Sequence, residues 1–192
     1  AIINLHPFHT IHVKTVHEQY PEARLYGTVR HHERFPDLPW EALKSEDRTL
    51  HQEYAADLEF TVPRGVDFVS DNEHIHFSSV MAYHPSSKTI HSDDTLNYFH
   101  GPSLLRMVGV GDSVGFHPTL SSALEKRPGA SKDFEEWATA MIERWKDAEN
   151  LCAAHTAALL SSENEGDYIH QRMLKALEKV RSTLKVHEKK YG

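Results

Sequence analysis

The chain has 192 residues, 39% of them hydrophobic and 26% charged, which is the size and composition of one ordinary globular domain. Its 21 Lys and Arg against 28 Asp and Glu give a formal net charge of −7, which argues against a nucleic-acid-binding protein with a broad basic face. No stretch approaches the roughly 18 to 20 consecutive apolar residues of a membrane helix, so we expect a soluble protein without a membrane partner.

The first third of the chain predicts a strand, helix, strand unit of the α/β kind. A short apolar run is followed by a histidine-rich loop. Apolar residues then recur at helical spacing up to Pro21, which cannot extend a helix. The predicted elements are a strand at 2–5, a helix at 11–20, a strand at 24–27 and a helical turn at 40–43 within a polar excursion, 30–52.

The middle of the chain predicts short strands joined by turns. Residues 98–132 hold five glycines and predict a mobile, loop-rich segment with a short helix at 120–126. Asp93 and Asp94 directly follow the last predicted strand before this segment. The predicted strands lie at 58–62, 66–69, 75–83 and 89–91, the last two forming a hairpin closed by a turn at 84–88.

Two long helices are predicted near the C-terminus. Apolar side chains recur at helical spacing from Phe134 to Trp145, and acidic residues occupy the first turn. A second helix is predicted at about 167–190, ending in a basic run that suits a helix C-terminus. Between them, residues 151–154 predict a buried strand that ends at His155.

Histidine is over-represented, at 16 residues. It is the commonest metal ligand and titrates near neutral pH, so the composition favours metal or proton chemistry. The single cysteine, Cys152, excludes an intrachain disulfide framework and a cysteine-based zinc finger. One free thiol is compatible with a reducing compartment, and the first residues do not resemble a signal peptide, so we expect a cytoplasmic protein.

His6, His9 and His12 form an H-x-x-H-x-x-H run after the first predicted strand. In a loop, this spacing can turn two or three imidazoles toward one point, and neutral imidazole suits zinc, iron or manganese. The alternative is a surface histidine cluster. His74 and His76 would share one face of a strand, either as ligands or as an exposed polar face.

An aspartate after the hairpin can bridge two cations, because each carboxylate oxygen can accept one. An Asp pair such as Asp93 and Asp94 is also ordinary turn chemistry. His155 at a strand end is either a ligand or a structural histidine. Ligand sites assemble in loops at strand ends of α/β folds, so four strand ends that each deliver His or Asp favour a metal site.

The order of these segments resembles a divergent, poorly characterised branch of the metallo-β-lactamase-fold superfamily. The resemblance implies a layered α/β domain over 1–192 that holds one or two divalent ions, zinc above iron or manganese. The position of the superfamily's bridging aspartate corresponds to Asp94. The implied ligands are His6, His9, His76, Asp94 and His155, with His12 as an added ligand or an orienting residue. The resembling segments are 2–9, 20–27, 79–96 and 150–155.

The chain departs from the superfamily pattern in three places. Its H-x-H-x-D-H motif is absent, because the histidine run contains no aspartate. The Gly-His signature of the next motif is also absent, so the ligand there is either His74 or His76. The strands that precede the first histidine motif in the superfamily are almost absent, so we expect either a domain incomplete at its N-terminus or a sheet completed in another way. Uncovered sheet edges would favour a homo-oligomer or pairing with a missing N-terminal segment.

The resemblance implies a hydrolase that acts on a small-molecule ester, lactone, thioester or phosphodiester with metal-activated water. Asp93 or His74 would accept the proton. The missing aspartate motivates an alternative, a non-catalytic degenerate module that binds metal, or nothing, and serves as a scaffold. A third hypothesis is a pH-responsive interaction protein whose histidines charge below about pH 6.5.

Overall fold

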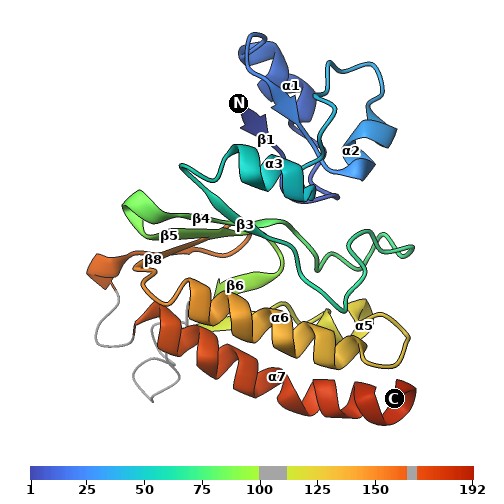
Figure 1. The fold of residues 1–192 in the computed structure, drawn as a ribbon, viewed down its shortest axis with the longest axis vertical. Helices are drawn as coiled ribbons and strands as arrows, with labels where there is room; N and C mark the ends of the chain where they lie inside the picture. The colour runs from blue at the N-terminus through green and yellow to red at the C-terminus, as the bar shows by residue number, and fades with distance from the viewer. Residues whose placement is uncertain (100–111, 164–167) are drawn as a thin grey trace.

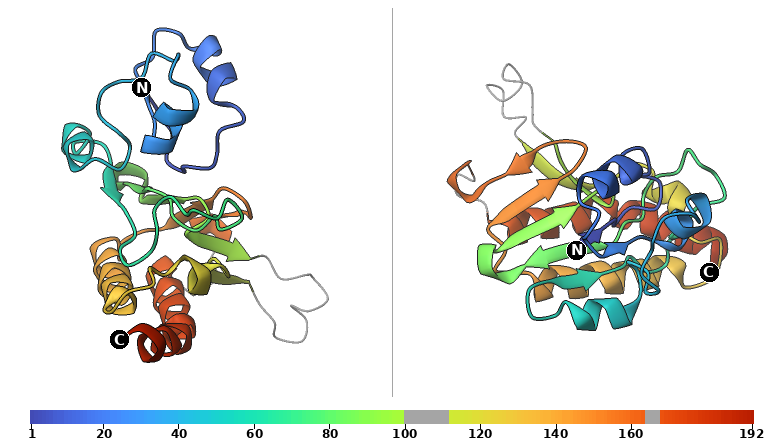
Figure 2. Two further views of the ribbon diagram at one scale, coloured as in Figure 1. Left: turned by 90° about the vertical axis from the view of Figure 1, so that its right-hand side faces the viewer. Right: turned by 90° about the horizontal axis from the view of Figure 1, so that it is seen from above.

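The computed structural model describes residues 1–99, 112–163 and 168–192. A five-stranded sheet lies between an N-terminal layer of short elements and a layer of two long helices, α6 (Ala130–Arg144) and α7 (Ile169–Tyr191) (Figure 1). A view turned by 90° shows the same stacking, with the N-terminal layer on the sheet face opposite the two helices (Figure 2). No helix in the described ranges is long and apolar enough to cross a membrane.

The N-terminal layer begins with the predicted strand, helix, strand unit, which is confirmed. β1 (Ile2–Ile3) pairs in parallel with β2 (Leu25–Tyr26), and α1 (Val13–Gln19) connects them. The helical turn predicted at 40–43 is wrong: Trp40 forms a single bridge to Leu25.

Helices occur on either side of that segment, as α2 (Val29–Arg34) and α3 (Arg48–Glu53). Each buries only one side chain, His31 in α2 and Leu50 in α3. With one buried side chain each, the two helices show no apolar periodicity that the sequence could reveal.

The main sheet contains the predicted hairpin, which is confirmed, with Lys88 in the left-handed region at φ 49° in its turn. The strands on the two sides of the hairpin differ in direction, because β5 (Thr89–Ser92) and β8 (Asn150–Ala153) are parallel, whereas the other strand pairs of this sheet are antiparallel. The strand order is β3 (Glu59–Thr61), β4 (Met81–His84), β5 (Thr89–Ser92), β8 (Asn150–Ala153) and β9 (Ala158–Leu159).

Two strand predictions need correction. Residues 66–69 do not form a strand, because Val66 makes only one isolated bridge, to Leu124. The Asp67 amide donates to the Ala123 carbonyl, and the Gly65 carbonyl accepts the Glu125 amide. The strand predicted at 75–83 begins only at Met81. Its first part is a loop that passes between the sheet and the N-terminal layer, where the Val80 amide bonds to the Leu5 carbonyl at 2.9 Å.

The loop-rich segment predicted at 98–132 contains two strands in its described part, whereas its short helix, predicted at 120–126, is confirmed. β6 (Leu96–Phe99) and β7 (Ser113–Phe116) form an antiparallel pair, followed by α5 (Leu120–Ala123). Gly115 lies within β7 against the Phe99 ring, and a glycine in a strand obscures the alternating pattern. The mobility expected for 100–111 concerns residues outside those that the structure describes.

Apolar side chains cover both faces of the main sheet. On β4, Met81 and Tyr83 face the larger core with α6 (Ala130–Arg144) and α7 (Ile169–Tyr191), and Ala82 faces a smaller cluster that includes Leu5 from the N-terminal layer. Both long helices agree with the sequence prediction. The N-terminal layer is therefore packed on the sheet, which positions the loop that follows β1.

Candidate metal centre

Three loops bring histidine and aspartate side chains to one edge of the main sheet. β5 and β8 run parallel with Ser92 opposite Ala153, so the residues that follow both strands leave the sheet at the same edge. The Ala154 amide extends this pairing with a hydrogen bond of 2.9 Å to the Ser92 carbonyl. The loop after β1 reaches the same region, because the Leu5 carbonyl accepts the Val80 amide.

These loops place His6, His9 and Asp94 around one point. Within the described ranges, their ligand atoms form a group in which all lie within 4.8 Å of one another. The Nε2 atoms of His6 and His9 lie 3.1 and 3.5 Å from Oδ2 of Asp94. His155 approaches the other oxygen, with its Nε2 3.6 Å from Oδ1 of Asp94. Both oxygens of Asp94 therefore face histidine nitrogens.

The imidazole rings are packed closely. His6 and His9 stack with their ring centroids 3.9 Å apart, and Nε2 of His9 lies 2.7 Å from Nε2 of His155. Two imidazole nitrogens at this distance need a proton or a cation between them, because two lone pairs repel each other. In the absence of a cation, one of the two nitrogens therefore carries a proton and the other accepts it.

Carboxylates on two sides of His9 control its protonation. Burial alone lowers the pKa of the ring, but hydrogen bonds and charge interactions with Asp93 and Asp94 outweigh burial and raise it to about 9. Burial raises the pKa of both carboxyls, and their histidine partners more than offset this and hold each pKa well below its usual range. Burial lowers the pKa of His6. Without a cation, the centre is an imidazolium between two carboxylates.

The donor set around His6 is compatible with a divalent cation, provided that the ring proton changes nitrogen. The residue is 1% exposed, and its buried Nε2 has no partner with acceptable hydrogen-bond geometry, although Asp94 is close. Its Nδ1 accepts a hydrogen bond of 3.1 Å from the Phe8 amide. A cation at Nε2 satisfies the buried atom and requires the ring proton to lie on Nδ1, so that the Phe8 amide loses this acceptor. Imidazole and carboxylate together form a donor set that suits zinc.

Three of the predicted site residues lie outside the group. His12 is exposed at the start of α1, and His74 is exposed in the loop before β4. His76 stacks on Phe8 with ring centroids 4.6 Å apart, and its Nε2 bonds to a backbone carbonyl of its own loop. His76 is nevertheless a neighbour of the group, because its ring centroid lies 6.1 Å from that of His6.

Asp93, predicted as a proton acceptor, lies beside the group and is 7% exposed. Its Oδ1 lies 3.6 Å from Nδ1 of His9, the ring nitrogen that faces away from Asp94. Its Oδ2 lies 3.9 Å from Nε2 of His91. From this position, a carboxylate orients a metal-binding histidine and increases its basicity.

His31, which is fully buried, was not predicted as a site residue from the sequence. Its Nε2 donates to the backbone carbonyl of His9 at 3.2 Å, and its Nδ1 accepts the Thr28 amide at 3.2 Å. Burial lowers the pKa of His31 to about 4, so the ring stays neutral and keeps this orientation near neutral pH. No local pattern links it to His9, because the contact depends on how α2 packs against the loop.

His117 was also missed. It follows β7 directly, its pKa is lowered by burial, and the charges of Asp94 and His155 act on it. The sequence did contain a signal, since a strand followed by His-Pro also occurs at His6. The signal could be used only if residues 113–116 were predicted as a strand, and they were not.

Comparisons with known proteins identify the fold. No family model and no curated protein matches the chain. A crystal structure of the DIM-1 metallo-β-lactamase is similar, with a TM-score of 0.50 and 16% identity over 96% of this chain and 68% of that chain. A second structure of that enzyme, exposed to ceftazidime, has a TM-score of 0.49 and 14% identity over 93% of this chain and 67% of that chain. The chain has the metallo-β-lactamase fold, as the order of its motifs predicted.

Proposed function

We propose that the chain is a metal-dependent hydrolase whose cation is held by His6, His9, Asp94 and His155. The observation that carries this proposal is the meeting of three imidazoles and one carboxylate, from three separate loops, around one partly buried point. The fold of the solved neighbours supports the same class of chemistry. Zinc is the proposed metal, because imidazole and carboxylate oxygen are among its preferred ligands.

A bound divalent cation supplies Lewis acidity and lowers the pKa of a coordinated water toward about 7. The residues of the chain set up the rest of the site. Asp93 orients the His9 ring through Nδ1, and His31 fixes the His9 backbone through its carbonyl. We assign the proton-accepting role to Asp93 rather than His74, because Asp93 contacts the group whereas His74 is exposed away from it.

The proposed substrate is a small ester, lactone, thioester or phosphodiester. The net charge of −7 supports a small molecule rather than a nucleic acid.

The test is metal analysis of protein purified without a His-tag, combined with turnover of a panel of small esters, lactones, thioesters and phosphodiesters. We expect stoichiometric metal and turnover that a chelator abolishes and added zinc restores. His9→Ala and Asp94→Ala lose both, whereas His12→Ala, at an exposed histidine of the same run, retains both. Absence of stoichiometric metal and of chelator-sensitive turnover would contradict the proposal.

A second candidate is a non-catalytic module that binds metal as a structural element. The absence of an aspartate from the histidine run favours it, since that run then offers only imidazoles. In this case, His9→Ala and Asp94→Ala lower metal content and thermal stability, and no substrate of the panel is turned over by the metal-loaded wild type.

A further inference from the structure

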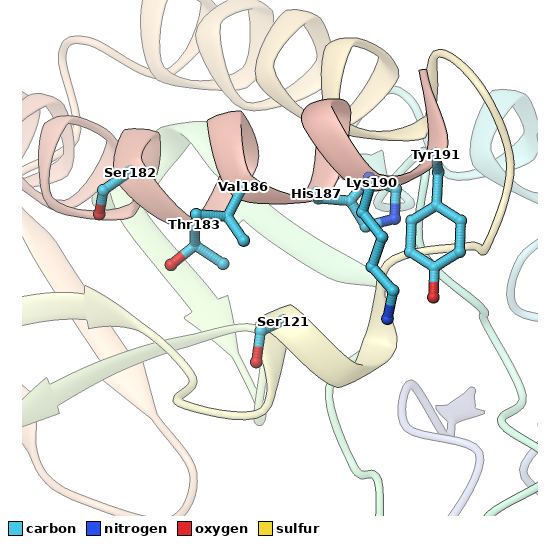
Figure 3. A pocket seen from close by; sticks show the side chains of 7 residues that line it. All are labelled: Ser121, Ser182, Thr183, Val186, His187, Lys190 and Tyr191. Carbon is cyan, nitrogen blue, oxygen red and sulfur yellow. The ribbon is translucent and has the colours of Figure 1, made fainter.

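A cavity of about 380 Å³ lies between α5 and the C-terminal half of α7 (Figure 3). No residue of the candidate metal centre lines it. One wall is a single face of α7, within residues 182–191, and Ser121 contributes from α5. The volume falls in the range of roughly 300 to 1,000 Å³ that is typical of small-molecule sites.

His187 lines this cavity and is buried without a partner. The residue is 6% exposed, and neither Nδ1 nor Nε2 has a hydrogen-bond partner within the described ranges. Its ring packs against Tyr191, with centroids 4.7 Å apart. An imidazole always carries at least one N–H, so burying it unpaired is unfavourable. An acceptor that enters the cavity and reaches the ring removes this cost.

The other polar groups at the cavity are hydrogen-bond donors, and none is acidic. The side chain of Lys190 extends from α7 toward α5 (Figure 3), and its ammonium lies 4.9 Å from the Tyr191 ring centroid. In the part of the chain that the structure describes, no carboxylate forms an ion pair with Lys190. Hydroxyls of Ser121, Ser182, Thr183 and Tyr191 complete the polar lining. This set of groups suits an anion.

Apolar surface accompanies these donors. Val186 is 69% exposed at the cavity, and the Tyr191 ring forms part of the same wall. A bare inorganic ion would leave this surface uncovered, whereas an organic ligand would bury it.

We propose that this cavity binds a small organic anion, a carboxylate or phosphate attached to a compact apolar body. The anionic oxygens accept hydrogen bonds from Lys190 and His187, and the apolar body lies against Val186 and the Tyr191 ring. The site does not depend on the proposed metal, because no residue of the metal centre takes part.

The test is calorimetric titration of the full chain with phenyl phosphate, benzoate, inorganic phosphate and benzylamine. EDTA is present throughout, so that anion binding to a metal at the other site does not contribute. We expect saturable binding of phenyl phosphate or benzoate, weaker binding of inorganic phosphate and no binding of the cation benzylamine. The preference between phenyl phosphate and benzoate identifies the anionic group that the cavity selects.

Two further measurements locate the binding. Lys190→Gln lowers the affinity for the preferred anion by about tenfold or more, because a charge-assisted hydrogen bond is lost. The matched control Lys189→Gln, on the same helix, leaves the affinity unchanged. In wild-type protein labelled with ¹⁵N-histidine, the ring nitrogen resonances of His187 shift on addition of that anion. Binding of benzylamine as tight as that of the anions, absence of anion binding at millimolar concentration, or unchanged affinity in Lys190→Gln overturns the proposal.

Discussion

His9 determines the charge of the candidate metal centre, because its two ring nitrogens face different carboxylates. Nδ1 faces Asp93 and Nε2 faces Asp94, and together they raise the pKa of the ring to about 9, although burial lowers it. A proton on His9 and a cation at the same nitrogen exclude each other. The site is therefore charged by a proton when no metal is bound, and metal binding has to release that proton.

We predict that zinc affinity rises with pH up to about 9. Because His9 loses its proton on binding, the apparent affinity at pH 7 is about 100-fold lower than above pH 9. Asp93→Asn removes one of the carboxylates that raise this pKa, so the rise in affinity moves to lower pH. Competition with a chromophoric chelator from pH 6 to 10 measures both. Equal affinity at pH 7 and 9 in the wild type contradicts the prediction.

At the scale of elements, the first turn of α2 supports the loop that carries His6 and His9. His31 joins the Thr28 amide at the start of the helix to the backbone carbonyl of His9. The ring does this only when neutral, with its proton on Nε2 and its lone pair on Nδ1. The folded state thus resists protonation of His31, and its pKa falls from 6.5 to about 4, primarily because the ring is buried.

This makes part of the folding stability dependent on pH. Above pH 6.5, His31 is neutral in both the folded and the unfolded state, and its contribution to the free energy of unfolding is complete. As the pH falls from 6.5 to 4, the unfolded state takes up a proton that the folded state does not, so about 3 kcal/mol of stability is lost. Urea denaturation of wild type and His31→Asn at pH 7 and 4.5 should show a smaller loss in the variant. His84→Asn, at an exposed histidine, is the control and should behave as the wild type.

Two glycines with positive φ test how the turn after β3 packs on α6. A Cβ on Gly65 (φ +70°) would lie 2.0 Å from the Ala130 carbonyl oxygen, whereas the nearest atom to a Cβ on Gly129 (φ +79°) would be 4.0 Å away. Gly129→Ala therefore incurs only backbone strain, about 1 kcal/mol. Gly65→Ala should cost at least about 2 kcal/mol more, because the backbone must move. Similar denaturation midpoints for the two variants would show that Gly65 does not pack tightly against the Ala130 carbonyl.

At the scale of the whole molecule, the candidate centre joins parts of the chain that are far apart in sequence. His6 and His9 belong to the N-terminal layer, whereas Asp94 and His155 follow strands of the main sheet. A cation bound by all four would link the layer to the sheet, and this link would exist only in the folded state.

Zinc should therefore stabilise the fold. At a free zinc concentration 100 times the Kd, we expect about 3 kcal/mol of stabilisation and a rise in Tm of about 5 to 10 °C. The rise should reverse on addition of EDTA and be absent in Asp94→Ala, while the matched control His12→Ala responds as the wild type does. Differential scanning calorimetry measures these shifts. A similar rise in Asp94→Ala would mean that zinc stabilises the protein elsewhere.

Elements with strong local patterns could be predicted from the sequence. The helical spacing that begins at Phe134 marks α6, and the turn residues before Lys88 mark the β4–β5 hairpin. Elements without such patterns were missed. β7 contains Gly115, and α2 buries only His31, so neither shows the periodicity of its class.

The sequence by itself determined the chemistry of the site and the order of its parts: histidines after the first strand, an aspartate after the hairpin and a histidine after a late strand. Only the tertiary structure decided that His6, His9, Asp94 and His155 meet while His12, His74 and His76 lie outside the group. The physical reason is that convergence depends on the parallel register of β5 and β8 and on the packing of the N-terminal layer against the sheet. These are long-range contacts, and no local periodicity encodes them.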